Sequence, residues 1–292
     1  MSQSNNQARY DDDVDSAYGS EVQSSTASLT ESIYRYRQLY GRSFHSDFGL
    51  AESWGPNDER HANAMDSFHH TYSVMLEGKL FLAPIRDNVQ KILDIGTGTG
   101  IWTIDVGDLF PQAVVIGTDI TPIQTRFAPP NVRYELEDAK QPWTYEDDTF
   151  DFVHVRGMIG VIADWDAFYR EAFRVCKPGG FFEDMSNSCN IISDDGSVEE
   201  GSPMDIYGKV LWEGGKKLGH TFRHYEDDIQ RKGMEAAGFV DIVTHEFRAP
   251  IGTWPTDPGL KEIGLWTRYS FSSDAEGKQS GYKAMCLKHN TY

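Results

Sequence analysis

The chain is poor in cysteine and has no long apolar run. Its three cysteines, Cys176, Cys189 and Cys286, show no Cys-x-x-Cys spacing. This pattern gives no disulfide framework or zinc cluster and fits a reducing compartment. No stretch of about 18 apolar residues occurs, so no transmembrane span and no membrane partner are expected. The N-terminus also lacks a hydrophobic signal core and an arginine-rich transit pattern. We therefore expect a location in the cytoplasm, the nucleus or both.

Positive charge is scarce as well. The chain has 27 Lys and Arg against 45 Asp and Glu, a formal net charge of −18. Because phosphate binding needs a basic footprint, we expect no nucleic-acid partner. The adjacent His69 and His70 lack the spacing of three or four that puts two metal ligands on one helix face, so no metal site is expected. What is present, 39% hydrophobic residues in a chain of 292, suffices for a large packed domain.

The chain divides by composition. Residues 1–29 are rich in Ser, Gln, Asn and Asp, which predicts a disordered acidic tail. Residues 30–292 are predicted to form one domain in three parts. These are an N-terminal helical cap or lid at 30–84, an α/β core at 85–250, and an irregular C-terminal segment at 251–292, which follows Pro250 and has Pro255 and Pro258 near its start.

The most informative stretch is Lys-Ile-Leu-Asp-Ile-Gly-Thr-Gly-Thr-Gly at residues 91–100. It predicts a buried strand, a glycine turn and then an amphipathic helix, an arrangement that presents backbone N–H groups to a ligand. Ile101 stands next to the last glycine, so neither the dinucleotide pattern nor a P-loop fits. Asp94 would repel a phosphate but suits an ammonium or sulfonium centre. The alternative is an ordinary glycine-rich turn without a ligand.

Further acidic residues stand just past two later strands. Asp119 ends the strand predicted at 113–120, about 25 residues after Asp94, and a carboxylate there can accept from both ribose hydroxyls. Asp138 follows the strand predicted at 132–136 and can accept from an adenine amino group. Strands are also expected at 149–156, from 181, and at 239–245; helices are expected from 30 to 40, at 57–78, 164–176, 204–218 and 225–237. This alternation predicts a doubly wound, mostly parallel α/β sheet.

Two sets of motifs carry a family resemblance. Residues 94–100, Asp119, residues 137–139 and Lys-Pro-Gly-Gly at 177–180 resemble, in order and spacing, the class I S-adenosylmethionine methyltransferases. More specific stretches are similar to the LaeA-like methyltransferases, a fungal family tied to secondary-metabolite control. These are Tyr-Gly-Arg-Ser-Phe-His at 40–45 and residues 56–59, 93–102, 117–124, 141–143 and 151–156. The resemblance covers residues 30–265 and implies a Rossmann-like core.

The resemblance also implies the roles of individual residues. It implies S-adenosyl-L-methionine as cofactor, with Asp94 behind the turn, Asp119 on the ribose and Ile120 over the adenine. The methionine portion would be lined by Gly96, Thr97, Gly98 and Gly100; Asp138 and Ala139 would meet the adenine edge, and Val155 and Arg156 would close the floor. The chain departs from the family at its end, where residues 272–292 are short and polar and show no final antiparallel strand.

The resemblance leaves three functions open. The first is a methyltransferase acting on a small aromatic or polyketide-like metabolite. The second is a regulatory methyltransferase that acts in a protein complex, and the third is a cofactor-binding scaffold without catalysis. No catalytic base is assigned, because in-line displacement from a sulfonium needs one only where the acceptor must lose a proton. His154 is interpreted as a packed core residue, and Arg156-Gly157-Met158 replaces the stretch typical of adenine and glutamine N-methylation.

Overall fold

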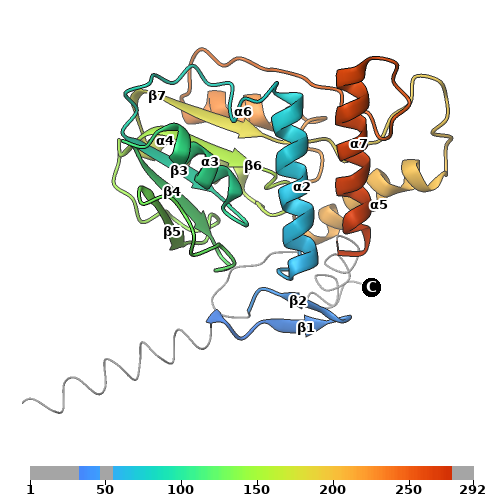
Figure 1. Ribbon diagram of the computed structural model, residues 1–292, viewed down its shortest axis with the longest axis horizontal. Coiled ribbons are helices and arrows are strands. Elements are labelled where there is room, and N and C mark those ends of the chain that lie inside the picture. The colour runs from blue at the N-terminus through green and yellow to red at the C-terminus, as the bar shows by residue number, and fades with distance from the viewer. Residues whose placement is uncertain (1–32, 47–54, 278–292) are drawn as a thin grey trace, which may run out of the picture.

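A five-stranded parallel sheet forms the centre of the molecule in the computed structural model, which describes residues 33–46 and 55–277. Its strand order is β5-β4-β3-β6-β7 (Figure 1). The strands are β3 (Lys91–Ile95), β4 (Val114–Asp119), β5 (Val132–Leu136), β6 (Phe150–Arg156) and β7 (Cys176–Met185). Because the chain moves outward from β3 in both directions, the sheet is doubly wound, and the predicted fold class is confirmed.

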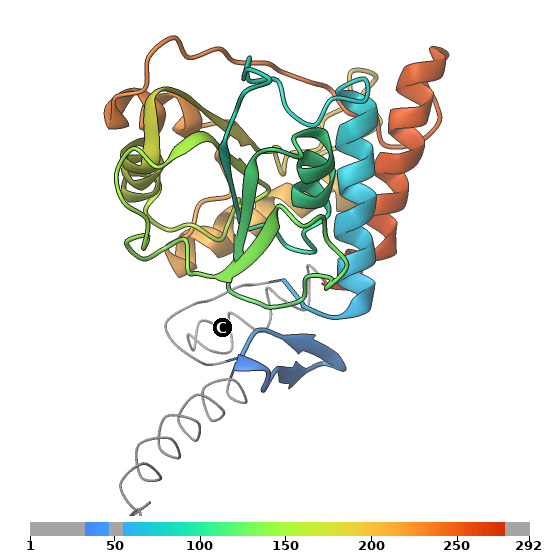
Figure 2. The same cartoon turned by 60° about the vertical axis from the view of Figure 1, so that its left-hand side comes forward.

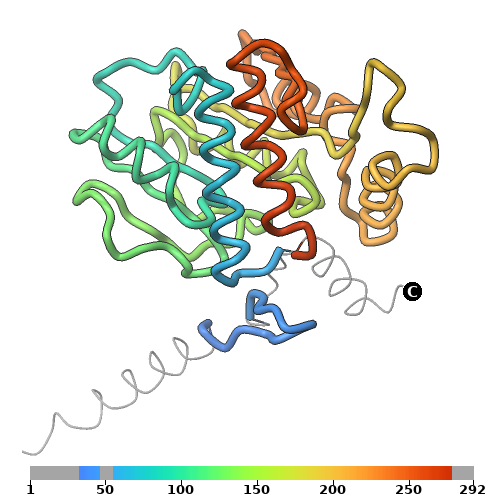
Figure 3. Tube along the Cα trace, turned by 45° about the vertical axis from the view of Figure 1, so that its right-hand side comes forward, coloured from blue at the N-terminus to red at the C-terminus, as the bar shows by residue number. Residues whose placement is uncertain are grey.

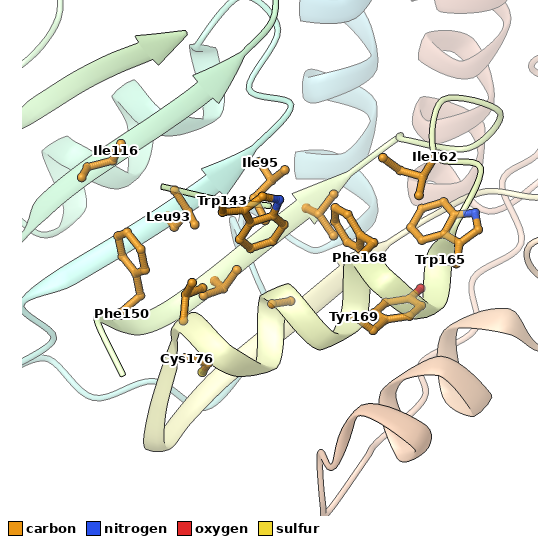
Figure 4. Packing of buried hydrophobic residues seen from close by; sticks show 14 residues of the cluster. Leu93, Ile95, Ile116, Trp143, Phe150, Ile162, Trp165, Phe168, Tyr169 and Cys176 are labelled. Atoms are coloured by element: carbon orange, nitrogen blue, oxygen red, sulfur yellow. The ribbon is translucent and has the colours of Figure 1, made fainter. Parts of the chain in front are cut away.

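Both faces of the sheet are covered by helices. Leu93 and Ile95 of β3 pack with helix α4 (Trp165–Val175) in a cluster that includes Phe168 and Tyr169 (Figure 4). The alternate residue Ile92 packs on the other face, against Trp102 of helix α3 (Ile101–Leu109). Strands buried on both faces read as continuous apolar runs, which is why the sequence shows them clearly.

The outer helices begin at side chains that cap their first turns. Asp58 accepts from the His61 N–H at the start of α2 (Glu59–Met75), and Asp257 accepts from the Leu260 N–H at the start of α7 (Pro258–Ser273). Helices α2 and α7 lie side by side, next to the sheet (Figures 1 and 3). The part of the chain between β7 and α7 contains two further helices, α5 (Pro203–Leu218) and α6 (Ile229–Ala237). No helix in the described part of the chain is long and apolar enough to cross a membrane.

The helix predicted from residue 30 to 40 is wrong over residues 34–40, although Ile33 is helical. The chain instead forms a hairpin of β1 (Arg37–Leu39) and β2 (Arg42–Phe44), below α2 in Figure 2. Tyr40 and Gly41 have φ of 53° and 74°. Two successive left-handed residues form the tight turn that suits an antiparallel hairpin, and they cannot continue a helix.

Two C-terminal predictions are also corrected. The segment 251–292 is not irregular throughout, because α7 occupies 16 residues of it behind the Asp257 cap and Pro258. Residues 239–245 form no strand: Asp241 has a φ of 54°, which interrupts an extended run, and Val240 and Val243 are 80% and 73% exposed. The predicted disordered tail 1–29, Cys286 and most of residues 272–292 lie outside the described residues.

Candidate functional site

The glycine turn joins β3 to α3 at the carboxyl edge of the sheet. Gly96, Gly98 and Gly100 have φ of 68°, 59° and 82°, a region that side-chain-bearing residues rarely adopt. Gly100 directly precedes α3 as its N-cap. A Cβ on Gly96 would collide with Met158 Sδ, and one on Gly100 with Tyr134 Oη. The turn therefore depends on glycine for both its conformation and its close packing.

Contacts from neighbouring elements hold this turn. The Thr97 N–H donates to the Thr118 carbonyl over 2.8 Å, and the Thr97 hydroxyl lies 2.9 Å from that of Thr103 in α3. The Gln124 amide donates to the Gly98 carbonyl over 2.6 Å. The Thr97 N–H and hydroxyl, which were predicted to line the ligand, therefore stabilise the turn instead. Gln124 also stabilises the turn, and the sequence analysis did not identify it.

Asp94 lies behind the turn, as predicted, and is paired there. Its side chain is buried on the α3 side of the sheet, where Oδ1 lies 2.8 Å from His154 Nδ1. The His154 ring stacks on Trp102 at 3.7 Å between ring centroids. His154 is only 1% exposed, which confirms its interpretation as a packed residue and leaves it out of reach of a methyl acceptor.

Asp119 ends β4 beside the glycine turn. Its Oδ2 accepts from the Gly98 N–H and its Oδ1 from the Thr121 N–H, both over 2.9 Å. Burial raises the pKa of this carboxyl to about 6, although the N–H donors act in the opposite direction. A carboxylate has about four acceptor positions, so about two stay available for hydroxyl groups. Ile120 follows and is partly exposed at the same edge.

Asp138 follows β5 with one oxygen unsatisfied. Its Oδ1 accepts from the Lys140 N–H over 3.1 Å, whereas its Oδ2 is buried and has no hydrogen-bond partner among the described residues. An unpaired buried carboxylate oxygen is costly, and a ligand donor would relieve that cost. The adjacent Ala139 carbonyl accepts from the Trp143 indole over 3.2 Å, which fixes the backbone here.

The two residues predicted to close the floor point in opposite directions. The Val155 side chain is fully buried in the core on the α4 side, so only its backbone can reach the edge. Arg156 is partly buried below α2, with Nη2 3.0 Å from His69 Nδ1 and the guanidinium 4.9 Å from the centre of the Tyr72 ring. Burial lowers the pKa of Arg156. Sequence reasoning missed this pairing, although His69 and Tyr72 are three apart on one helix face.

The strand register arranges these groups in a row. Ile95 pairs with Thr118 on one side and with Val155 on the other, and Asp119 pairs with Leu136. The order along the edge is therefore Asp138, Asp119, the glycine turn and Arg156. Three interstrand steps of about 4.8 Å give this row a length of about 14 Å. Within the described residues, no group of three or more His, Cys, Asp or Glu could hold a metal ion.

Comparison with known proteins identifies the family. A family model described as a methyltransferase domain matches residues 67–241. Methyltransferase pytC of Aspergillus terreus is 37% identical over 258 residues, covering 88% of this chain and 78% of that protein. The secondary metabolism regulator LAE1 of Cochliobolus heterostrophus is 32% identical over 226 residues, covering 76% and 73%. The probable methyltransferase tdiE of Emericella nidulans is 31% identical over 245 residues, covering 83% and 74%.

The family model spans more than half of the chain, and the curated relatives match most of its length. The expectation that this chain is a class I methyltransferase, drawn from the glycine turn and the acidic residues at the strand ends, is therefore confirmed. The chain belongs to the methyltransferase domain family and, within it, to the LaeA-like group of class I S-adenosylmethionine-dependent methyltransferases.

Proposed function

We propose that the carboxyl edge of the sheet binds S-adenosyl-L-methionine with its nucleoside over β4 and β5. The observation that carries this proposal is the buried Oδ2 of Asp138, which has no hydrogen-bond partner within residues 33–46 and 55–277 and can accept from an adenine amino group. The spare acceptor positions of Asp119 suit both ribose hydroxyls. The proposed contact set is Asp94, Gly96, Thr97, Gly98, Gly100, Asp119, Ile120, Asp138, Ala139, Val155 and Arg156, with Thr97 acting as a brace and Val155 through its backbone.

The side chains of this edge would hold the cofactor in position, and none of them is assigned a proton transfer. S-adenosylmethionine supplies an activated methyl group on a sulfonium when it is bound. Asp119 would fix the ribose, and the glycine turn allows the backbone to approach without an intervening Cβ. The Asp94–His154 pair places a carboxylate behind the turn without exposing it to the acceptor. Holding donor and acceptor in line can supply much of the rate, so no catalytic base is assigned.

For the acceptor we favour a small-molecule metabolite. The methyltransferase pytC, at 37% identity, and the probable methyltransferase tdiE, at 31%, support this choice. A regulatory role in a protein complex is the second candidate, supported by the regulator LAE1 at 32% identity. A scaffold that binds the cofactor without catalysis is the third. We place each of these activities in the cytoplasm, the nucleus or both.

Binding of S-adenosylhomocysteine, measured by calorimetry, tests the cofactor site. We expect Asp119→Ala and Asp138→Ala each to weaken binding about tenfold or more, because each removes an acceptor to a buried donor. Asp87→Asn changes an exposed acid away from the edge and serves as the control. Unchanged affinity in both edge variants would show that the site is assigned wrongly.

Strains of the host that carry a deletion or Gly96→Ala separate the three functions. A metabolite-directed enzyme should change the products of its pathway in both strains while pathway transcripts stay constant. A regulator should change the transcripts in both strains. A scaffold should give a phenotype on deletion alone, provided that immunoblots show equal amounts of the Gly96→Ala chain.

A further inference from the structure

We infer that Arg156 is the receptor for the carboxylate at the amino-acid end of the cofactor, and that His69 and Tyr72 hold it in place. This inference rests on the proposed function and adds the side chain that binds the carboxylate of the cofactor. Ile95 pairs with Val155, so the next residues, Gly96 and Arg156, leave neighbouring strands side by side. Asp119 and Asp138, which are assigned to the nucleoside, lie on the opposite side of Gly96, at the end of β4 and just after β5.

The guanidinium of Arg156 carries a charge that the described residues do not pair. Its Nη2 donates to His69 Nδ1 over 3.0 Å, and no carboxylate of the described residues lies within ion-pair distance of it. Arginine has five N–H donors, of which this contact uses one. Residue 156 is partly exposed, and none of its side-chain nitrogens is among the described buried atoms that lack a partner, so the remaining donors are accessible to a ligand.

The acidic groups nearest to Arg156 are committed to other partners. Asp94 contacts His154, and Asp105 Oδ2 lies 2.9 Å from His69 Nε2. Glu183 Oε2 accepts from two backbone N–H groups, those of Leu82 at 2.8 Å and Ala83 at 2.6 Å. These carboxylates favour the charged guanidinium from a distance without satisfying its donors.

The α2 contacts fix the direction of the guanidinium. Because Arg156 can only donate, His69 Nδ1 must accept, and the ring proton therefore lies on Nε2, facing Asp105. The Tyr72 ring lies against the guanidinium, with 4.9 Å between its centroid and the central carbon. A planar donor group held in this way is pre-oriented for a carboxylate, which it can bind through two parallel hydrogen bonds.

The row along the edge matches one direction of the cofactor. Asp138 and Asp119 offer acceptors at one end, and Arg156 offers donors at the other, about 14 Å apart by strand spacing. S-adenosylmethionine has donors on its nucleoside and a carboxylate at the end of its amino-acid chain. In the opposite orientation, the carboxylate of the cofactor would lie next to Asp119 and Asp138, and the adenine amino group would lie next to the Arg156 guanidinium.

Two ligands that differ in one group test this assignment. They are S-adenosylhomocysteine and its decarboxylated analogue, 5′-S-(3-aminopropyl)-5′-thioadenosine, titrated calorimetrically into the wild-type chain, Arg156→Gln and Arg156→Lys. We expect the wild type to bind the carboxylate form at least about tenfold more tightly. Arg156→Gln should lose this preference and keep its affinity for the analogue within about twofold. Arg156→Lys should keep a part of the preference, because lysine keeps the positive charge but cannot form the two parallel hydrogen bonds of a planar guanidinium.

Arg126→Gln is the matched control, since it removes the same charge from an exposed arginine and should keep the full preference. Equal affinity of the wild type for the two ligands would overturn the assignment even if Arg156→Gln failed to fold. A preference that persists in a folded Arg156→Gln would overturn it as well. A wild-type chain that binds neither nucleoside would instead overturn the proposed function, and this inference with it.

Discussion

At the residue scale, the backbone conformation of the glycine turn sets what each position tolerates. Gly96 has a φ of 68°, and its Cα hydrogen faces the Met158 thioether. Alanine at this position would meet two separate costs, a left-handed backbone and a collision with Met158. The left-handed conformation alone costs about 1–2 kcal/mol for a residue with a Cβ.

Gly96→Ala should therefore lower the free energy of unfolding by more than the conformational cost alone. Gly179→Ala is the control, because Gly179 has a φ of 76° and, apart from its chain neighbours, no atom of the described residues would lie within 4 Å of an alanine methyl group there. We expect about 1–2 kcal/mol for Gly179→Ala and a larger loss for Gly96→Ala, measured by urea denaturation. Equal losses would mean that Met158 moves aside at no cost.

The raised pKa of Asp119 makes cofactor binding depend on pH. Its pKa of about 6 in the free chain means that the carboxyl is half protonated near that pH. Ribose hydroxyls donate to the ionised form, so binding should release about half a proton per site near pH 6 and almost none near pH 8. Affinity for S-adenosylhomocysteine should consequently fall as the pH drops below 6.

Calorimetry at pH 6 in two buffers of different ionisation enthalpy measures this proton. The observed binding enthalpy should differ between the buffers for the wild type and agree between them for Asp119→Asn, which has no proton to release. Proton uptake, or affinity that rises on acidification, would contradict the role given to Asp119.

The positions of site residues were predictable where they follow from the end of a strand. Asp119 and Asp138 stand just past parallel strands, whose carboxyl ends meet at one edge, so the sequence alone placed them together. Side-chain direction was harder to predict. Val155 and Arg156 are adjacent, and strand alternation sends one into the core and the other towards α2. The Thr97 brace depends on Thr103 and Thr118, which no local pattern reveals.

At the element scale, the β1–β2 hairpin is tied to both outer helices by one arginine. Arg42 donates to Asp58 at the start of α2 and to Asp274 at the end of α7, with distances of 2.6 and 2.7 Å. Asp274, which is 2% exposed, also lies 2.7 Å from His61 Nδ1. Burial acts to raise the pKa of Asp274, but hydrogen bonds from Arg42 and His61 leave it below its ordinary value.

This depressed pKa gives the stability a defined pH dependence. A carboxyl whose pKa is lower in the folded state stabilises the fold above its unfolded pKa, about 3.9, and loses that contribution on acidification. Asp274→Asn should cost about 2 kcal/mol or more at pH 7, and the difference from the wild type should shrink below about pH 4. Urea denaturation across this pH range measures it.

Asp194→Asn is the control, since its ion pair with Arg248 is exposed and should contribute less than about 0.5 kcal/mol. A loss for Asp274→Asn that stays constant down to pH 3 would show that its carboxylate charge is not what holds the hairpin.

The segment after α6 shows how context overrides a local pattern. Residues 239–245 are rich in β-branched side chains, yet Asp241 interrupts them, and Phe239 is anchored between Phe173 and Phe182. Val240→Asp should change the free energy of unfolding by less than about 0.5 kcal/mol, because Val240 is 80% exposed. Phe239→Ala should cost about 3 kcal/mol. A large loss for Val240→Asp would place it in a buried strand after all.

At the scale of the whole molecule, the sequence predicted the layers better than the periphery. The central strands β3, β4 and β6 are largely buried runs of apolar residues, and in the chain α3 lies between β3 and β4 and α4 between β6 and β7, so the layers were readable from the sequence. The hairpin at residues 37–44 contacts the end of helix α7 through Arg42 and Asp274, which are 232 positions apart, and no local window shows such a contact. Both elements were predicted incorrectly, although the Asp257 cap and Pro258 mark the start of α7 in the sequence.

The overall charge bears on how a regulatory member of this family could act. A net charge of −18, from 45 acidic against 27 basic residues, opposes association with a polyanion. If the chain alters transcripts, it should therefore do so without holding DNA itself. Fluorescence anisotropy with a labelled duplex should show no binding at micromolar protein in about 150 mM salt, with S-adenosylhomocysteine present or absent. Binding that weakens steeply as salt rises would reveal a local basic surface and would favour the regulatory function over the metabolite enzyme.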